Sequence, residues 1–189
     1  MAESSSSGVV RRVAQLARRA VAALRPRRIT LEQPPVTFTD GDGREVDVRP
    51  YRERDFEGLV AMYDDFDSSQ RAQGTPPLGE DAVRDWLREV LDGVNVVART
   101  DGRVVGHVMF VPDDTGRHEL AIFVHQDYQG AGVGTKLLAV GLEHARSEGV
   151  EYVWLSVEAW KRDAQRLYQR AGFSTVNPMG ASHRMSRYL

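Results

Sequence analysis

A short stretch of the chain, residues 120–138, constrains the fold more than any other. An apolar run at Leu120–Val124 is followed by a loop with three glycines, and a helical pattern begins at Val133. A strand, a glycine-rich loop and a helix in this order point several backbone N–H groups and the positive end of the helix toward one place. The stretch therefore predicts an α/β domain that binds a phosphorylated ligand.

Two common phosphate-binding loops do not fit the three glycines, Gly130, Gly132 and Gly134. A Walker A loop ends in Gly-Lys-Ser/Thr, whereas Gly134 is followed by a threonine before the lysine. A dinucleotide fingerprint has the spacing Gly-x-Gly-x-x-Gly, whereas these glycines stand at alternate positions. The pattern that remains is Gln129-x-x-Gly132-x-Gly134, directly ahead of a helix.

The composition is that of an ordinary globular domain. The 189 residues are 41% hydrophobic and 28% charged, which suits one domain with a sizeable core. The chain has no cysteine, which excludes disulfides, thiolate metal sites and cysteine nucleophiles. No apolar run reaches the ~20 residues that span a bilayer, so we expect a cytoplasmic protein. The five histidines lack the spacing of a ligand set, so we expect no metal site.

Residues 1–33 differ from the rest of the chain and are predicted to form an arm. Residues 1–30 contain seven Arg and one acid, a net charge of +6, and the total of −2 leaves −8 for the remainder. The serine-rich start is predicted to be disordered. From Val9 to Leu24 the apolar residues fall on one side of a helix and the arginines on the other. The helix ends at Arg25, because the residue before a proline disfavours the helical conformation.

This basic amphipathic helix has several interpretations that the sequence leaves open. Residues 9–28 would suit binding to an anionic surface, a partner protein or nucleic acid, and they would also suit a role as a targeting segment. Packing on their own domain, or on the second subunit of a homodimer, explains the pattern equally well. The acidic remainder argues against nucleic-acid binding by the main domain.

Residues 34–189 are predicted to form one domain in which strands and helices follow one another. The predicted strands are Val36–Thr39, Glu45–Arg49, Val94–Arg99, Val104–Val111, Leu120–Val124, Tyr152–Val157, Phe173–Val176 and His183–Tyr188. The predicted helices are Arg54–Asp67, Glu80–Leu91, Val133–Glu148 and Arg162–Arg170.

Two motifs in this domain resemble the GNAT superfamily of N-acetyltransferases. The first is the glycine loop after Val124, and the second is a strand and helix followed by Leu167-Tyr168 and Gly172-Phe173. The resemblance covers about residues 118–173. It implies a GNAT-type mixed, mostly antiparallel sheet flanked by helices. It also implies an acyl-CoA-dependent N-acyltransferase that moves acetyl from acetyl-CoA directly to a primary amine, on a protein lysine, a protein amino terminus or a small molecule.

The resemblance also assigns residues to the cofactor. The strand before the loop would bind the pantetheine arm, with the Val124 N–H as oxyanion donor, and the loop would bind the pyrophosphate. Lys161 stands where the family usually has an asparagine, and its ammonium is expected to meet a CoA phosphate instead. The expected cofactor-binding residues are Ile122, Phe123, Val124, Gln129, Gly130, Ala131, Gly132, Val133, Gly134, Thr135, Lys161 and Ala164.

By the same resemblance Tyr168 is the general acid, since a phenol is protonated at neutral pH and can supply a proton to a departing thiolate. Glu119 is the expected general base, with His118 and Glu158 as open alternatives. The acids of Asp64–Asp67 would suit a cationic amine, although solvated helix-end acids explain them equally well. The competing hypothesis for the whole chain is a non-catalytic acyl-CoA-binding regulatory module.

Overall fold

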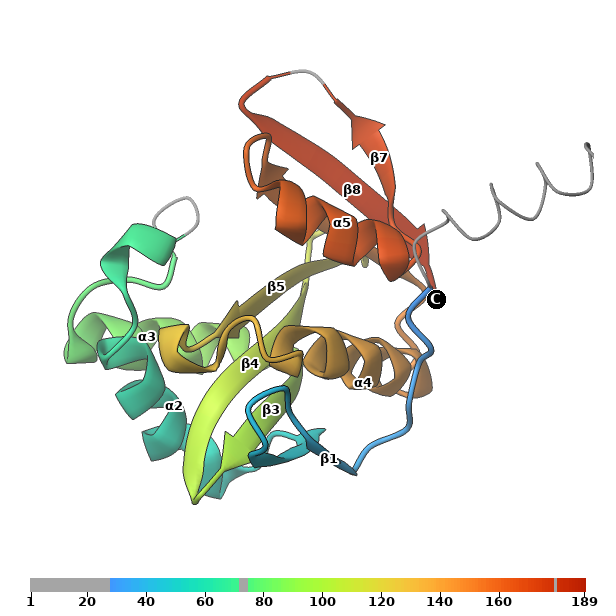
Figure 1. The fold of residues 1–189 in the computed structure, drawn as a ribbon. Coiled ribbons are helices and arrows are strands. Elements are labelled where there is room, and N and C mark those ends of the chain that lie inside the picture. Colours follow the sequence, from blue (N-terminus) through green and yellow to red (C-terminus); the bar gives the residue numbers. More distant parts are fainter. Residues whose placement is uncertain (1–27, 72–74, 179) are drawn as a thin grey trace, which may run out of the picture.

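The computed structural model describes residues 28–71, 75–178 and 180–189 (Figure 1). The helix predicted for Val9–Leu24 lies outside these residues. No helix in the described part of the chain is long and apolar enough to cross a membrane.

One twisted sheet of eight strands forms the centre of the domain, in the spatial order β1-β2-β3-β4-β5-β6-β8-β7. Among the described residues β5 and β6 run parallel, and the other neighbouring pairs are antiparallel. The predicted mixed, mostly antiparallel sheet is therefore confirmed. The strands are β1 Val36–Thr39, β2 Glu45–Pro50, β3 Val94–Thr100, β4 Arg103–Pro112, β5 His118–Val124, β6 Tyr152–Glu158, β7 Ser174–Asn177 and β8 Ser182–Tyr188.

Two helices cover each face of the sheet. Helices α4 (Val133–Ser147) and α5 (Arg162–Arg170) lie on one face, and α2 (Phe56–Asp64) and α3 (Glu80–Val90) lie on the other. Figure 1 shows α4 crossing in front of the central strands, with α2 and α3 together at the left. Three short 3-10 turns, at Glu53–Asp55, Ser68–Gln70 and Gln126–Tyr128, complete the described helical elements.

The alternating side chains of the central strands separate two cores. On β4, Val108 and Phe110 face α4, whereas Met109 faces α2 and α3, as expected for successive strand residues. The α4 core is apolar in all its members, including Leu137 and Leu155. The α2–α3 core is also mainly apolar, but it surrounds two buried polar side chains that are described below.

The first predicted helix is shorter than its periodicity suggests. We expected Arg54–Asp67, and the structure has a 3-10 turn at Glu53–Asp55 followed by α2, which ends at Asp64. The side chain of Asp67 accepts a hydrogen bond from Ser69 N (2.8 Å) and starts a new turn, so the chain leaves the helix before it. The other elements begin and end within about two residues of their predicted bounds.

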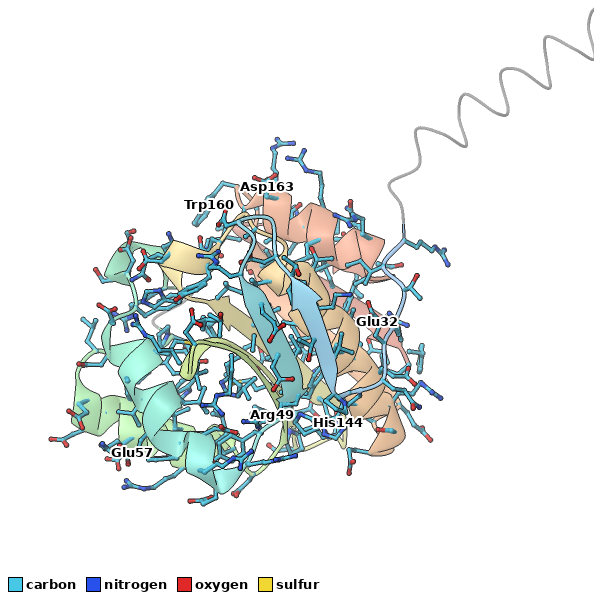
Figure 2. The ribbon with its side chains drawn as sticks, turned by 60° about the horizontal axis from the view of Figure 1, so that its bottom comes forward. Glu32, Arg49, Glu57, His144, Trp160 and Asp163 are labelled. Carbon is cyan, nitrogen blue, oxygen red and sulfur yellow. The ribbon has the colours of Figure 1, made fainter. Side chains whose placement is uncertain are left out.

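Residues 28–33, the described part of the predicted arm, run along the α4 face of the domain. Ile29 N donates to the carbonyl of Arg170 (2.9 Å), and Lys136 Nζ pairs with Glu32 Oε1 (2.6 Å). Ile29 and Leu31 pack against the α4 core. Figure 2 shows Glu32 and His144 on this side of the molecule and Glu57 on the side of α2 and α3.

Candidate active site

The glycine loop has the backbone shape that its sequence predicts. Gly130 and Gly132 have φ of +76° and +94°, a region that side chains with a Cβ rarely adopt, and Gly132 is the N-cap of α4. The Gln129 side chain donates from Nε2 to the carbonyl of Val124 (2.8 Å), which ties the loop to the end of β5. The first backbone N–H groups of a helix have no partner within the helix. The loop therefore presents such donors, and the positive end of α4, to the space beside β5.

Strands β5 and β6 separate next to this loop. Their ladder consists of two pairs, His118 with Val153 and Glu119 with Trp154, and no further pair is found among the described residues. His125 N donates to Val105 O (3.0 Å) on the β4 side. Backbone groups of alternate residues in an antiparallel pair point to opposite sides, so those of Ile122 and Val124 point toward β6. They face the space where the two strands have parted.

A cleft of about 630 Å³ occupies this space. Eight of the twelve expected cofactor residues line it, together with the expected acid Tyr168. These eight are Ile122, Val124, Gln129, Gly130, Gly132, Gly134, Thr135 and Ala164. The strand end, the loop and helix α5 are thus brought together around one cleft.

The other four expected cofactor residues lie elsewhere. Phe123 faces the α2–α3 core, because it alternates with its neighbours on β5. Val133 is fully buried under the start of α4, and Ala131 lines a separate hollow on the outer side of the loop. Lys161 does not line the cleft, and its Nζ pairs with Glu158 Oε2 (3.3 Å).

Tyr168 stands where two hollows meet. It lines the cleft just described and also a smaller pocket of about 290 Å³ on the other side of β5. Its side chain is half-buried and packs against Phe173, with ring centroids 5.9 Å apart. Burial and the nearby charge of Glu158 raise the pKa of Tyr168 above its ordinary value. The phenol therefore holds its proton throughout the neutral range.

The smaller pocket is mainly apolar, and the described residues that line it include a single carboxylate. That carboxylate belongs to Glu119, and Thr75, Ser156 and Tyr168 add hydroxyl groups. The apolar lining comes from α3 and from strands β4 and β5: Trp86, Val90, Met109, Val111, Leu120, Ala121, Ile122 and Phe123.

Of the three candidate bases, only Glu119 lines this pocket. Desolvation by the surrounding protein raises the pKa of Glu119, with a smaller opposing effect from Arg184. A raised pKa brings a carboxylate closer to the value that suits a general base. His118 precedes it on β5 and so points to the opposite face of the sheet. Glu158 is held by Lys161.

The three aspartates near the end of α2 do not line the pocket. Asp65 accepts a hydrogen bond from His125 Nε2 (3.1 Å), and Asp67 caps the turn that follows. Asp64 is exposed. These positions agree with the simpler interpretation, in which the acids belong to the end of a helix.

Sequence reasoning missed several lining residues. On α5, Arg166 and Arg170 contribute cations to the cleft, along with Asp163 and Gln169. The sequence did carry a signal for these two arginines. They are four residues apart in the predicted helix Arg162–Arg170 and therefore lie on the same face of it. Met109 and Ser156, which line the smaller pocket, carried no signal, because they come from strands far apart in the chain.

No group of three or more His, Cys, Asp or Glu in the described part of the chain is placed to hold a metal ion.

Comparison with known proteins identifies the family. The model of the acetyltransferase (GNAT) family matches residues 59–173, which is more than half of the chain. The chain therefore belongs to the GNAT acetyltransferase family.

Relatives with curated names agree with this assignment. A mycothiol acetyltransferase of Propionibacterium freudenreichii is 33% identical over 133 residues, which cover 67% of this chain and 42% of that protein. An uncharacterized N-acetyltransferase of Mycobacterium tuberculosis is 35% identical over 79 residues, 41% of this chain and 51% of the relative. The chain thus spans about half, or less, of the length of these relatives.

Solved structures show the same fold at lower identity. The GNAT domain of S. lividans PAT matches with a TM-score of 0.66 and 21% identity, over 84% of this chain and 100% of that chain. An acetyltransferase from Salmonella typhimurium, solved with its cofactor acetyl-CoA, matches with a TM-score of 0.60 and 21% identity, over 76% and 94% of the two chains. The predicted GNAT-type fold is confirmed.

Proposed function

We propose that this protein transfers an acetyl group from acetyl-CoA to a primary amine, directly and without a covalent acyl-enzyme. The observation that carries the proposal is the position of Tyr168, which lines both the loop-side cleft and the apolar pocket that contains Glu119. A donor thioester in the cleft and an amine in the pocket would meet beside a protonated phenol and a carboxylate. The chain has no cysteine to carry the acyl group.

The residues divide the work of acyl transfer as follows. Glu119, with its raised pKa, accepts a proton from the amine so that the nitrogen attacks the thioester carbonyl. The Val124 N–H stabilises the oxyanion, since the backbone groups of Val124 point into the opening between β5 and β6. A C–N bond forms and the C–S bond breaks. Tyr168 then donates its proton to the departing thiolate of CoA.

The lining of the smaller pocket supports a particular kind of acceptor. Most of its walls are aliphatic and aromatic, with hydroxyl groups from Thr75, Ser156 and Tyr168, and Glu119 is the one carboxylate among the described residues that line it. A polyamine would place further charges against apolar walls, which is unfavourable without paired groups. The pocket therefore favours an amine carried next to an apolar group, such as a chain amino terminus with an apolar first residue or a small apolar amine.

Release of CoA thiol from acetyl-CoA tests the proposal. The panel contains peptides with apolar or charged first residues, internal-lysine peptides, apolar monoamines and polyamines, and mass spectrometry locates the acetyl group. We expect amine-dependent thiol release, largest with the apolar acceptors. Tight CoA binding with no thiol release above background for any amine would replace this proposal with the non-catalytic acyl-CoA-binding module.

A further inference from the structure

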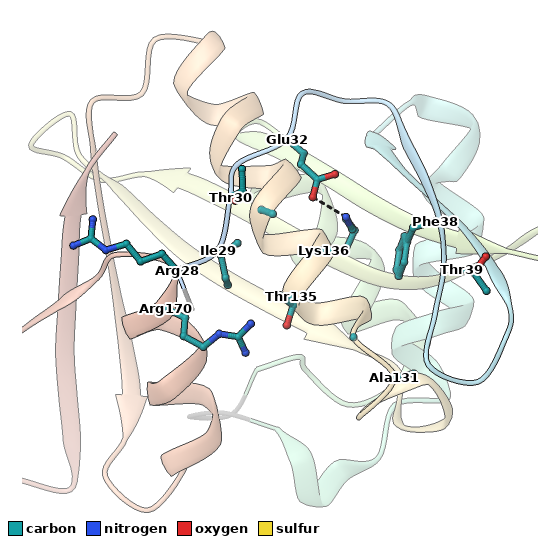
Figure 3. A pocket seen from close by; sticks show the side chains of 12 residues that line it. Arg28, Ile29, Thr30, Glu32, Phe38, Thr39, Ala131, Thr135, Lys136 and Arg170 are labelled. Carbon is teal, nitrogen blue, oxygen red and sulfur yellow. Dashed lines mark hydrogen bonds and ion pairs between the residues drawn. The ribbon is translucent and has the colours of Figure 1, made fainter. Parts of the chain in front are cut away.

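The sheet face that carries the smaller pocket continues onto strands β6 and β8. The core under α2 and α3 takes its strand residues from β3, β4 and β5, so these helices cover the middle of the sheet rather than β6 and β8. Ser156 on β6 lines the pocket, and Trp154, two residues before it, lies on the same face. The opposite face of both strands belongs to the α4 core, on the side of helices α4 and α5, where Figure 3 shows Lys136 and Arg170. A strip of sheet outside the α2–α3 core therefore adjoins the pocket.

Arg184 on β8 brings a cation to this strip. It is the partner of Ser156 in the β6–β8 ladder, so the side chains of the two residues lie on the same face. Its Cζ atom lies 3.9 Å from the centroid of the Trp154 ring. The indole is itself fixed, because Trp154 Nε1 donates to Asp113 Oδ2 (2.9 Å). The guanidinium is thereby held against the sheet beside the pocket.

Arg184 is exposed, and it forms no ion pair with any residue that the structure describes. It is nevertheless near enough to Glu119 to oppose, in part, the rise that desolvation causes in the pKa of that carboxylate. The two other acids of the strip have partners of their own, since Asp113 accepts the indole hydrogen bond and Glu158 pairs with Lys161 (3.3 Å). The pocket and its edge thus present a carboxylate and a guanidinium that lie near each other without pairing.

We propose that Arg184 binds the carboxylate of an acceptor whose amine lies at Glu119, so that the acceptor is an α-amino acid with an apolar side chain. The inference rests on the proposed function and narrows it. An α-amino acid carries its amine and its carboxylate on the same carbon, and it therefore fits between a carboxylate and a guanidinium that do not pair with each other. A guanidinium also binds a carboxylate more strongly than it binds the neutral amide that a peptide offers at this position. The apolar walls of the pocket would contact the side chain of the amino acid.

Acetylation of L-leucine and of L-leucinamide tests the inference, because the amide replaces the carboxylate by a neutral group. Thiol release gives kcat/KM for each acceptor, and mass spectrometry identifies the N-acetyl product. Arg184→Met should lower kcat/KM for leucine about tenfold, as for the loss of one charge-assisted hydrogen bond that remains partly exposed. The value for leucinamide and the dissociation constant of CoA should not change. Arg184→Lys keeps the charge but not the planar fork, so its value for leucine should lie between those of wild type and Arg184→Met.

Arg117 offers a matched control on the same face of the sheet. It is also exposed and also lies over an aromatic ring, with its Cζ 4.8 Å from the centroid of Tyr152, but it is not among the groups that shift the pKa of Glu119. Arg117→Met should keep the wild-type kcat/KM for both acceptors. Each variant is compared with wild type on the same acceptor, so the different basicity of the two amines cancels.

Three results would overturn the inference and leave the proposed function intact. These are an equal loss for both acceptors in Arg184→Met, no loss for leucine in that variant, or a wild type that acetylates leucinamide or peptides but not leucine. Absence of thiol release with every amine tested would overturn both the inference and the proposed function.

Discussion

The cleft that we propose binds acetyl-CoA and the pocket that we propose binds the amine lie on opposite faces of the same strand, β5, and they are built in different ways. They are named the cofactor cleft and the acceptor pocket below. Half of the fourteen residues that line the cleft come from one continuous stretch, which begins at Ile122 and ends at Thr135, and the other half come from α5. The pocket is made of side chains from α3 and from strands β4, β5 and β6, which are distant in the sequence. The cleft is therefore built from two segments that both carry sequence motifs, whereas the pocket depends on how the whole sheet folds.

The two hydrophobic cores, one on each face of the sheet, also differ from each other. The core under α4 consists of apolar residues. The core under α2 and α3 contains a buried chain of hydrogen bonds, from Tyr63 Oη to His107 Nδ1 (2.9 Å) and from His107 Nε2 to Asn95 Oδ1 (2.9 Å). Asn95 Nδ2 donates to backbone carbonyls at the end of α3, including Gly93 O (2.7 Å), so its Oδ1 accepts from His107. His107 is thereby fixed as the Nε2–H tautomer, and Tyr63 donates to Nδ1. Helices α2 and α3 are thus attached to the sheet through a buried side-chain network that includes the titratable His107.

The largest expected effect comes from replacing Glu119, the carboxylate of the acceptor pocket. Glu119→Gln should lower kcat/KM by about 10²–10⁴-fold and leave the affinity for CoA unchanged. Because the pKa of Glu119 is raised, wild-type kcat/KM should fall with acidification at a pH above the ordinary pKa of a glutamate, and this limb should vanish in the variant. Glu158→Gln is the control, and a larger loss there would assign the base to Glu158.

A substitution in the glycine loop should change a different quantity, the affinity for CoA. Gly132→Ala places a Cβ at a φ of +94°, a strain of about 1–2 kcal/mol, and should weaken CoA binding about tenfold by moving the N–H groups of the loop. Gly116→Ala is a matched control, since its φ is +75° and it lies in the β4–β5 turn with open space around it. It should lower stability similarly without changing the CoA affinity. Equal losses of CoA affinity in both variants would contradict the role of the loop.

Acid should destabilise the acceptor face through His107. Burial lowers the pKa of His107 to about 3, so the folded state keeps it neutral while the unfolded chain takes up a proton below its ordinary value. Its contribution to stability is complete above the unfolded pKa and is lost as the pH falls toward the folded one. Between about pH 7 and about pH 5.5 the loss should be about 1.3 kcal/mol. Urea unfolding of wild type and His107→Gln at both pH values measures the difference, and parallel pH profiles would contradict the assignment.

The smallest expected effect comes from a substitution in the acceptor pocket that removes no charged group. Ala121 lines the acceptor pocket and faces away from the cofactor cleft. Ala121→Leu fills part of the pocket and should raise KM for the amine about fivefold, with a stability cost of about 1 kcal/mol. The dissociation constant of CoA should stay constant. A variant that loses CoA affinity and keeps KM for the amine would reverse the assignment of the two hollows.

The difference between the cleft and the pocket also explains which features could be predicted from the sequence. The element order followed from periodicity, and the shape of the loop from glycines whose φ is positive in the structure, such as Gly130 and Gly132. The mostly antiparallel sheet was expected from the resemblance to the GNAT family. The end of α2 did not, because the Asp67 cap that interrupts the helix competes with an apolar pattern that continues. Phe123 was grouped with the cofactor residues because it adjoins Val124, and only strand alternation places it on the other face. The acceptor pocket could not be predicted, because Met109 and Ser156 become neighbours of Trp86 only once the sheet is assembled.

The central claim is that the thioester and the amine react beside Tyr168, where the cofactor cleft and the acceptor pocket meet. Tyr168→Phe removes one oxygen and keeps the ring that packs against Phe173. The decisive measurement is the turnover of acetyl-CoA with the best amine from the panel, together with the dissociation constant of CoA, in wild type and variant. We predict a loss of about 10²-fold or more in kcat with an unchanged dissociation constant. Unchanged turnover would contradict the claim and remove Tyr168 from the mechanism.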